Sequence, residues 1–311
     1  MLEHVLWTER FRPRTVSETI LPPDLKKTFQ QFVDDKNVPN LLLTGGAGTG
    51  KTTIARAMLE ELKCDYIVIN SSMNGNIDTL RNEILNFASS ISLSGGRKYV
   101  ILDEADGLTP LVQASLRNFM EEFSKNCGFI MTCNYKNKII KPLHSRCSVI
   151  DFTIPNEWKA KVAVQFLKRV ESILVEVGVP YDKMAVGILI QKYFPDWRRV
   201  LNELQRYSAT GSIDSGILAS IQDVSIKEVL EFCRDKNYDA IRKWVHDNSN
   251  QEQANIFRAV YEHGHELIDR KSIPELIVII ADYSYKAAFV ADHEINLCAM
   301  FIEIMMRLEW K

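Results

Sequence analysis

The 311-residue sequence predicts an α/β protein that begins with a parallel sheet and continues into two all-helical domains. Short apolar runs alternate with helical stretches through residues 1–155, a pattern typical of parallel strands joined by crossover helices. Beyond Pro155 the strand signal stops, and prolines divide the chain into helices. A connector of small residues at 209–216 then precedes a second helical segment. The expected domains are 1–155, 156–212 and 213–311.

Each expected element rests on a local pattern. The apolar runs predicted as strands are Leu41–Thr44, Tyr66–Asn70, Tyr99–Leu102, Phe129–Cys133 and Val149–Phe152. The helices expected between them lie near 51–62, 78–92, 110–124 and 137–144. The helices expected after the sheet are 157–178, 182–193 and 197–208, and apolar residues at spacings of three and four predict further helices at 274–290 and 295–308.

Composition limits the class of protein. With 25% charged and 46% hydrophobic residues, the chain resembles an ordinary globular protein. Its N-terminus lacks the apolar region of a signal peptide, and no apolar run approaches the roughly 18 residues of a membrane span. The six cysteines form no CxxC pair, which favours reduced, mostly buried thiols over a zinc site or disulfides. We therefore expect a cytoplasmic protein with no membrane partner.

The charges are distributed unevenly. The net charge is only −2, which argues against binding nucleic acid through bulk positive charge. Residues 213–311, however, hold 11 Lys and Arg against 17 Asp and Glu, so residues 1–212 carry a small positive excess. This distribution permits DNA binding by the first two domains and favours protein contacts for the acidic third domain.

Four of the 14 glycines lie between positions 45 and 50, in a sequence that matches the phosphate-loop pattern GxxxxGK[ST]. A predicted strand precedes the loop and a predicted helix follows it, as the pattern requires. Backbone N–H groups of such a loop converge on phosphates, the lysine reaches the β- and γ-phosphates, and the hydroxyl binds Mg²⁺. A glycine turn without function is the alternative, and this context argues against it. The predicted ATP ligands are Gly45, Gly46, Ala47, Gly48, Thr49, Gly50, Lys51, Thr52 and Thr53.

An acidic pair follows the predicted strand 99–102. We expect Asp103 to hold Mg²⁺ together with Thr52, and Glu104 to polarise the attacking water as a general base. Alone, such a pair is more often a solvated turn, but the phosphate loop about fifty residues earlier favours the catalytic interpretation. Asp106 is expected to have a capping or structural role. A DEAD-box helicase would need a second nucleotide-binding sheet, for which residues 156–311 offer no strands.

Further motifs carry a family resemblance. They are Trp7–Pro13, Ile101–Thr109, Thr132-Cys133-Asn134 and Lys138–Cys147. With these motifs the chain resembles the AAA+ clamp-loader ATPases, which include the small subunits of replication factor C and the large subunit of T4-type phage clamp loaders. The resemblance covers nearly the whole chain, up to the terminal Glu309-Trp310-Lys311, and its motifs are most specific in residues 1–210. It implies an AAA+ ATPase domain, a helical lid and a helical collar, and the host cytoplasm if a phage encodes the chain.

The resemblance also implies roles for single residues. Asn134 matches sensor 1, which orients the lytic water or contacts the γ-phosphate. Arg146 matches the arginine finger, which acts in trans on the ATP of a neighbouring subunit. Arg198 matches the sensor 2 phosphate contact, and Arg199 is the less favoured choice. The segment that lines the adenine pocket corresponds to Arg12, Pro13, Val16 and Ile20.

This chain departs from the family's pattern at one point of the phosphate loop, where Gly46-Ala47 stands in place of the usual Pro-Pro. The positions with a chemical role are intact, so we expect altered loop stiffness and retained binding. The implied cofactors are ATP and Mg²⁺. The implied partners are a sliding clamp, primer–template DNA, other copies of the chain and a distinct small clamp-loader subunit.

Contacts with DNA and clamp are expected in the first domain. Arg81 and Arg117 are candidates for DNA binding or for coupling DNA to the ATP site, together with Lys98 and the lysines of 136–141. A solvated helix face is the alternative for each of these charges. Helix 78–92 resembles the family's clamp-docking helix, and the side chains expected to be exposed for this contact are Phe87, Ile91 and Leu93.

Two other functions are compatible with parts of the pattern. An AAA+ DNA motor such as a branch-migration helicase would use the same ATP chemistry, but the acidic residues 213–311 argue against a DNA-binding third domain. A nucleotide-bound scaffold without turnover is a further alternative. It is opposed by the intact set Lys51, Thr52, Asp103, Glu104, Asn134 and Arg146.

Overall fold

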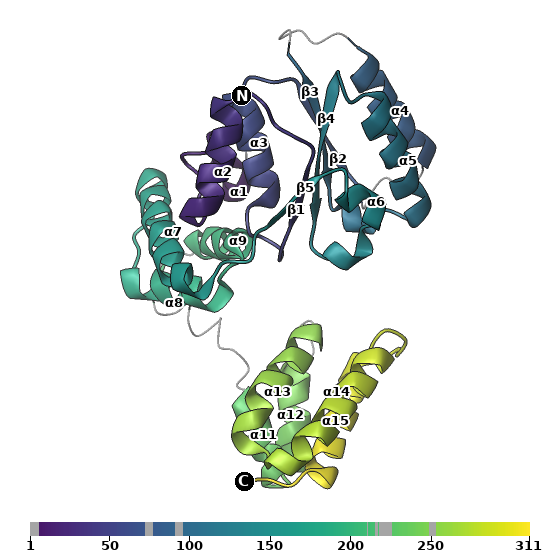
Figure 1. The fold of residues 1–311 in the computed structure, drawn as a ribbon. Helices are drawn as coiled ribbons and strands as arrows, with labels where there is room; N and C mark the ends of the chain where they lie inside the picture. Colours follow the sequence, from purple (N-terminus) through teal and green to yellow (C-terminus); the bar gives the residue numbers. More distant parts are fainter. Residues whose placement is uncertain are drawn as a thin grey trace. The chain divides into compact units, whose positions relative to one another are not determined.

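Five parallel strands form a single sheet in the order β2-β3-β4-β1-β5 (Figure 1). The structure, a computed structural model, describes residues 6–71, 77–90, 96–209, 211–214, 217, 226–248 and 253–311. The strands are β1 (Leu41–Thr44), β2 (Tyr66–Asn70), β3 (Lys98–Asp103), β4 (Cys127–Cys133) and β5 (Ser148–Asp151). All four pairings are parallel, so the strands' carboxyl ends share one edge.

The sheet order places β4 between β1 and β3. The phosphate loop follows β1, Asp103 ends β3 and Asn134 follows β4. Three polar segments that are far apart in the sequence therefore meet at the same sheet edge, which is where open α/β sheets bind their ligands. Leu41–Leu43 and all of β4 are buried, as expected of strands covered on both faces.

Helices cover both faces of the sheet (Figure 1). On one face lie α2 (Pro23–Asp34) and α3 (Lys51–Glu61), and Phe29 and Phe152 belong to the core on that side. The short helix α1 (Trp7–Arg10) packs instead against α9 (Trp197–Ser208). On the other face lie α4 (Ile77–Ser89), α5 (Pro110–Glu122) and α6 (Lys141–His144), over a core that includes Ile84, Leu116 and Phe129. The two cores lie on opposite sides of the sheet.

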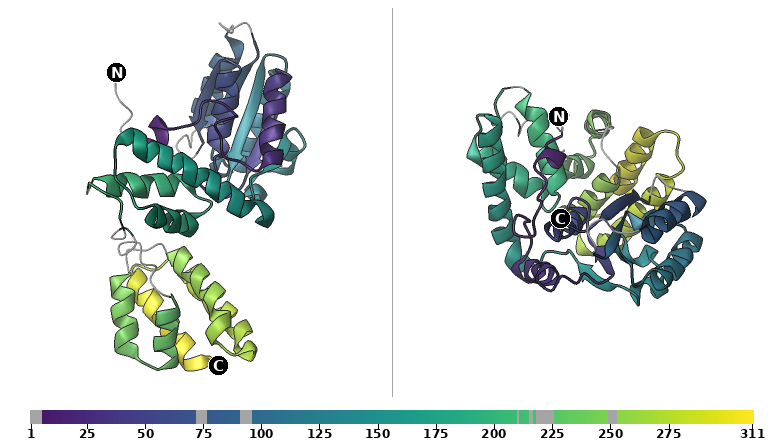
Figure 2. Two further views of the ribbon diagram at one scale, coloured as in Figure 1. Left: turned by 90° about the vertical axis from the view of Figure 1, so that its left-hand side faces the viewer. Right: turned by 90° about the horizontal axis from the view of Figure 1, so that it is seen from above.

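Three helices follow β5 and pack together as a helical layer (Figure 2). They are α7 (Asn156–Val177), α8 (Lys183–Tyr193) and α9 (Trp197–Ser208). Asp182 and Asp196 accept backbone N–H groups at the starts of α8 and α9, which are N-caps of the usual kind. The rings of Phe166 and Trp197 lie 4.2 Å apart and join α7 to α9. The N–H of Trp7 donates to Gln205 Oε1 at 2.9 Å and ties α9 to the N-terminal segment.

The chain divides into two compact units, Met1–Leu218 and Ala219–Lys311. The first unit contains both the sheet and α7–α9. The second contains α11 (Ile226–Arg234), α12 (Tyr238–Asp247), α13 (Gln253–Leu267), α14 (Ile273–Lys286) and α15 (His293–Arg307), with a separate hydrophobic core. The expected boundary after residue 212 lies a few residues before the division in the structure.

The predicted fold class is confirmed, with two differences in detail. The expected helix 137–144 is instead a short 3₁₀ turn at Lys136–Lys138 followed by α6. Pro142 has no N–H to continue a helix from 138, and it begins a new one at the first turn of α6. Helices α1 and α2 lie outside the predicted set, although Pro23 at the helix start and apolar residues at helical spacing mark α2.

In the described part of the chain no helix is long and apolar enough to cross a membrane. All six cysteines are free, as expected. Burial raises the pKa of Cys127 to about 11 and that of Cys233 to about 12, so these thiols stay protonated at neutral pH.

Candidate functional site

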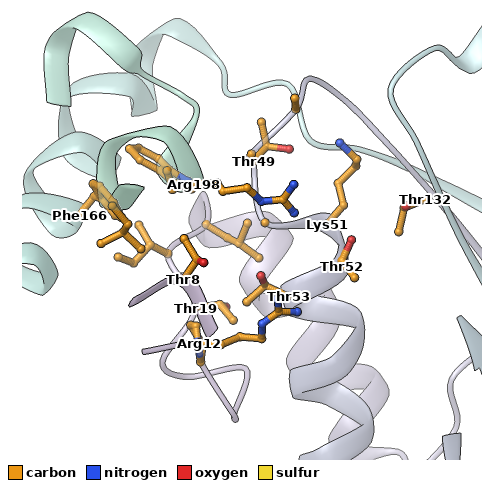
Figure 3. A pocket seen from close by; sticks show the side chains of 18 of the residues that line it. Thr8, Arg12, Thr19, Thr49, Lys51, Thr52, Thr53, Thr132, Phe166 and Arg198 are labelled. Atoms are coloured by element: carbon orange, nitrogen blue, oxygen red, sulfur yellow. The ribbon is translucent and has the colours of Figure 1, made fainter. Parts of the chain in front are cut away.

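A pocket lies where the phosphate loop, the N-terminal segment and the lid helices α7 and α9 meet (Figure 3). Its floor is the loop 47–53, and Asp103, Glu104, Thr132 and Asn134 line the end near the sheet. The opposite end is lined by apolar side chains that include Phe11, Ile20, Leu21, Phe166, Ile173, Trp197 and Leu201. The pocket therefore joins a polar end suited to phosphates to an apolar end suited to a base.

Lys51 begins α3 and turns back over its own loop. Its Nζ donates to the carbonyls of Gly45 at 2.8 Å and Gly46 at 2.7 Å, and to Asn134 Oδ1 at 2.9 Å. Burial lowers its pKa below the ordinary value of 10.5, and attraction to the Asp103 carboxylate opposes this shift. The predicted phosphate lysine and the predicted sensor 1 residue thus share a hydrogen bond. Gly45 and Gly46 contribute carbonyls to Lys51 and do not line the pocket.

Asp103 is the centre of a hydroxyl network. Its Oδ1 accepts hydrogen bonds from Thr52 Oγ1 and Thr132 Oγ1, both at 2.6 Å. Thr132 Oγ1 in turn accepts the N–H of Glu104 at 3.1 Å. Thr132 was not predicted, although a polar residue in an otherwise apolar strand was a usable signal. Through Thr132, β4 fixes both acidic residues at the end of β3.

Glu104 and Asn134 are positioned by their backbones. Glu104 has φ 56°, in the left-handed region, so it leaves the line of β3 immediately after Asp103. Asp106 Oδ2 accepts the N–H groups of Asn134 at 3.2 Å and Tyr135 at 3.1 Å, which fixes the end of β4. Asp106 therefore has the structural role expected from the sequence.

The donor set at this edge fits a magnesium ion. Thr52 Oγ1 and Asp103 Oδ1 are oxygen ligands of the kind that Mg²⁺ prefers, and they come from the phosphate loop and the acidic strand end as phosphate-loop ATPases require. In the described residues no separate cluster of His, Cys, Asp and Glu could hold a metal.

Of the four residues predicted for the adenine pocket, Arg12, Pro13 and Ile20 line it and Val16 does not. Val16 is fully buried in the core beside α2 and α3, and its N–H donates to Glu61 Oε2 at 2.7 Å. Val16 thus supports the pocket wall from behind.

The lid contributes Arg198, which extends from α9 over the phosphate loop toward Lys51 (Figure 3). The lid also contacts the loop directly, because the N–H of Trp197 donates to the Gly48 carbonyl at 3.2 Å. Gly48 has φ 70°, and a Cβ there would lie 1.8 Å from Asp196 Oδ1. Only glycine fits this contact between loop and lid.

An open groove continues from the phosphate end of the pocket. The residues that line both the pocket and the groove include Thr52, Asp103, Glu104, Arg12 and Arg198. The groove is lined in addition by residues that include Arg56, Asn70, Asn202, Gln205 and Arg206. Arg12 forms an ion pair with Glu9, and Arg206 forms one with Glu203 at 2.6 Å.

Arg146 lies away from this pocket, just after α6. Its Nε donates to Glu121 Oε1 at 2.9 Å, its Nη2 donates to the same oxygen, and its Nη1 donates to the Pro142 carbonyl at 3.1 Å. The hydrogen bonds from Arg146 lower the pKa of Glu121. Arg146 does not line the chain's own pocket.

The structure changes the candidate list for DNA and clamp contacts. Arg81 and Arg117 are exposed. Lys98 is buried, and its Nζ donates to the carbonyls of Phe87 and Ser90 at the end of α4, so it is excluded as a DNA contact. Phe87, which was expected to be exposed, is partly buried: its ring packs against the core and lies below Lys98 Nζ. Ile91 and Leu93 lie outside the described residues.

Comparison with known proteins places this geometry in a family. Residues 41–154 match the ATPase family associated with various cellular activities (AAA), and residues 159–219 match the AAA+ ATPase lid domain of the sliding-clamp-loader large subunit. The structure also resembles that of a Thermotoga maritima RuvB branch-migration motor, with a TM-score of 0.55 and 16% identity over 71% of this chain and 78% of that chain. At this identity the similarity concerns the fold alone.

Similar sequences extend over the whole length. The sliding-clamp-loader large subunit of Enterobacteria phage T4 is 34% identical over 99% of this chain and 98% of its own length. That of Escherichia phage RB69 is 32% identical over the same shares. The replication factor C small subunit of Thermofilum pendens is 30% identical over 97% of this chain and 96% of its own length. The chain therefore belongs to the AAA+ ATPases of the sliding-clamp-loader large-subunit family.

Proposed function

We propose that this chain is the ATPase subunit of a complex that loads a ring-shaped sliding clamp onto primer–template DNA. ATP binding orders the contacts between subunits, opens the clamp and engages the DNA, and hydrolysis releases the loaded clamp. The observation that carries this proposal is the convergence of Lys51, Thr52, Asp103 and Asn134 at one sheet edge, below the lid arginine Arg198. The similarity to clamp-loader large subunits over the whole chain supports the choice of substrate.

Each residue of the site has a proposed task. Lys51 and the N–H groups of the loop hold the β- and γ-phosphates, and Arg198 closes over them from the lid. Thr52 and Asp103 hold Mg²⁺, which neutralises phosphate charge when bound. Glu104 accepts a proton from the attacking water, and Asn134 orients that water while it holds Lys51. Arg146 of a neighbouring copy supplies the last positive charge to the transition state.

The second unit is proposed to join several copies of the chain to a distinct small subunit. Its excess of acidic residues disfavours phosphate contacts. On and after α14 it exposes Val278, Tyr285 and Phe289, at 66%, 70% and 73% of their surfaces, and the centroids of the last two rings lie 5.1 Å apart with the ring planes tilted by 55°. Large exposed apolar side chains of this kind mark protein contacts. Removal of residues 213–311 is expected to leave a monomer in sedimentation, and an oligomer of normal stoichiometry would contradict this role.

DNA is proposed to contact the first unit through backbone N–H groups and exposed cations such as Arg81 and Arg117. The clamp is proposed to dock on α4, with the partly buried Phe87 contributing the edge of its ring and Ile91 and Leu93 completing the contact. Contacts of this kind with the phosphate backbone predict DNA binding that weakens as the salt concentration rises.

The test is the ATPase rate of the assembled complex, measured with and without clamp and primed DNA. We expect both to stimulate hydrolysis together more than either does alone. A rate that neither ligand changes would refute the loader function. Strand displacement without a clamp would instead favour a branch-migration motor, the alternative that the shared fold leaves open.

A further inference from the structure

Arg56 is a cation that the proposed ATP chemistry does not use. It lies on α3, one helical turn after Thr52, and lines the groove that opens from the phosphate end of the pocket. Its Nε is buried without a hydrogen-bond partner, and Arg56 forms no ion pair within the described ranges. The Arg56 guanidinium is therefore not fully hydrogen-bonded within the described chain, and its other N–H groups can bind a carboxylate that reaches this groove.

The other charges of the groove have partners or tasks. Arg12 pairs with Glu9 and Arg206 pairs with Glu203. Asp103, Glu104 and Arg198 belong to the nucleotide site. Arg56 therefore remains as a positive charge at the mouth of the site, where a neighbouring copy must insert Arg146.

A move of Arg146 into the neighbouring site would also bring Glu121 close to that site. Its guanidinium is hydrogen-bonded to the carboxylate of Glu121, whose side chain is 57% exposed. When Arg146 reaches the phosphates of the next copy, Glu121 follows to within a few ångströms of them. The triphosphate, Asp103 and Glu104 would repel this carboxylate, because at about 10 Å or less such charges are not fully screened by salt. A cation opposite Glu121 removes this penalty.

We propose that Glu121 of one copy of the chain pairs with Arg56 of the next copy, beside the arginine finger. The proposal rests on the trans role of Arg146 in the proposed function. In the free chain Glu121 neutralises Arg146 in cis. In the assembly Arg146 turns to phosphate and Glu121 turns to Arg56, so the contact forms fully only when nucleotide sits between the copies. The pair adds specificity for a second copy of this chain to the ATP-dependent interface.

The two residues cannot pair within one chain. Arg56 is on α3 and Glu121 is on α5, and these helices cover opposite faces of the sheet (Figure 1). Direct contact between them therefore requires two copies, and substitutions this far apart within one chain are expected to be nearly additive. This makes a double-mutant cycle decisive.

The experiment measures ATP turnover of the full chain in its assembled complex for Arg56→Gln, Glu121→Gln and the double variant. Each single variant is expected to lower turnover at limiting subunit concentration by about three- to tenfold, and the double variant to be no slower than the slower single variant. The charge-swapped pair Arg56→Glu with Glu121→Arg is expected to recover part of the loss seen in each reversal alone. Additive losses and no recovery in the swapped pair would overturn the proposal.

Matched controls separate the possible outcomes. Glu122 is the neighbouring exposed acid on α5, and Glu122→Gln is expected to show no coupling to Arg56→Gln. ATP affinity of the uncomplexed Arg56→Gln chain is expected to equal the wild type, and a loss there would mean that Arg56 binds phosphate in its own chain. If Arg146→Ala keeps wild-type turnover, the proposal that Arg146 acts in trans is refuted. If Arg146→Ala is inactive and the losses in the Arg56–Glu121 double-mutant cycle are additive, only the proposed pairing of Glu121 with Arg56 is refuted.

Discussion

Replacing Thr132 by valine should disturb the positions of Asp103 and Glu104 while both acidic residues remain in the sequence. The two side chains have nearly the same shape, so the buried strand β4 keeps its packing. What is lost is the hydroxyl, which donates to Asp103 Oδ1 at 2.6 Å and accepts the Glu104 N–H at 3.1 Å. Thr132 is 1% exposed, so water cannot easily replace either hydrogen bond.

The expected magnitude follows from these two contacts. A hydrogen bond to a charged group contributes about 1.5–3 kcal/mol, and a buried N–H left without a partner costs about 1–3 kcal/mol. Asp103 is partly accessible and Thr52 remains as its second donor. The lower end of the sum, about 2–3 kcal/mol, is therefore expected, equivalent to a Tm lower by about 5–10 °C for a unit of this size. Loss of orientation at Asp103 and Glu104 should lower turnover by about 10- to 100-fold.

The assay combines thermal unfolding of the nucleotide-free chain with the ATPase rate of the assembled complex. Thr132→Ser is the matched control, because it keeps the hydroxyl and removes only a methyl group. The serine variant is expected to retain most of the activity. A valine variant with wild-type stability and turnover would show that Asp103 and Glu104 are positioned without Thr132, and the network would then have no catalytic meaning.

Three further predictions concern the same pocket. Glu104→Gln is expected to bind ATP normally and to hydrolyse it at least about 100-fold more slowly, because the amide cannot accept the water's proton, and an unchanged single-turnover rate would remove Glu104 from the mechanism. Gly48→Ala is expected to lower stability by about 1–3 kcal/mol and to weaken ATP binding, because the new Cβ clashes with the lid. Gly46→Ala is the neutral control, since no atom lies nearer than 3.9 Å to its new Cβ. Both variants are compared by thermal unfolding and nucleotide titration. Burial lowers the pKa of Lys51, whereas bound phosphates favour its charged form. ATP affinity should therefore fall as the pH rises through that lowered pKa. Calorimetry in two buffers is expected to show net proton uptake on binding. Binding without proton uptake at alkaline pH would contradict this assignment.

Sequence patterns predicted local features well. Every predicted strand is present with ends that differ by at most two residues, because alternation of apolar runs and helices is a local signal. The phosphate loop and the acidic strand end were identified because their chemistry requires fixed residue types at fixed spacings. Local patterns were weaker in the segment 136–144, where a proline split the expected helix, and at Lys98, which looked like a surface cation and is buried.

The sequence by itself determined the fold class, the nucleotide-binding elements and the identity of the groups that carry the proposed chemistry. Only the tertiary structure decided how these groups meet. The placement of β4 between β1 and β3 makes Thr132 the link to Asp103, Asn134 the partner of Lys51 and Asp106 the anchor of the sensor strand. The tertiary structure also buries Val16 behind the pocket and leaves Arg56 Nε without a hydrogen-bond partner among the residues that the structure describes. Such relations depend on strand order and on contacts across many intervening residues, and no local periodicity records them.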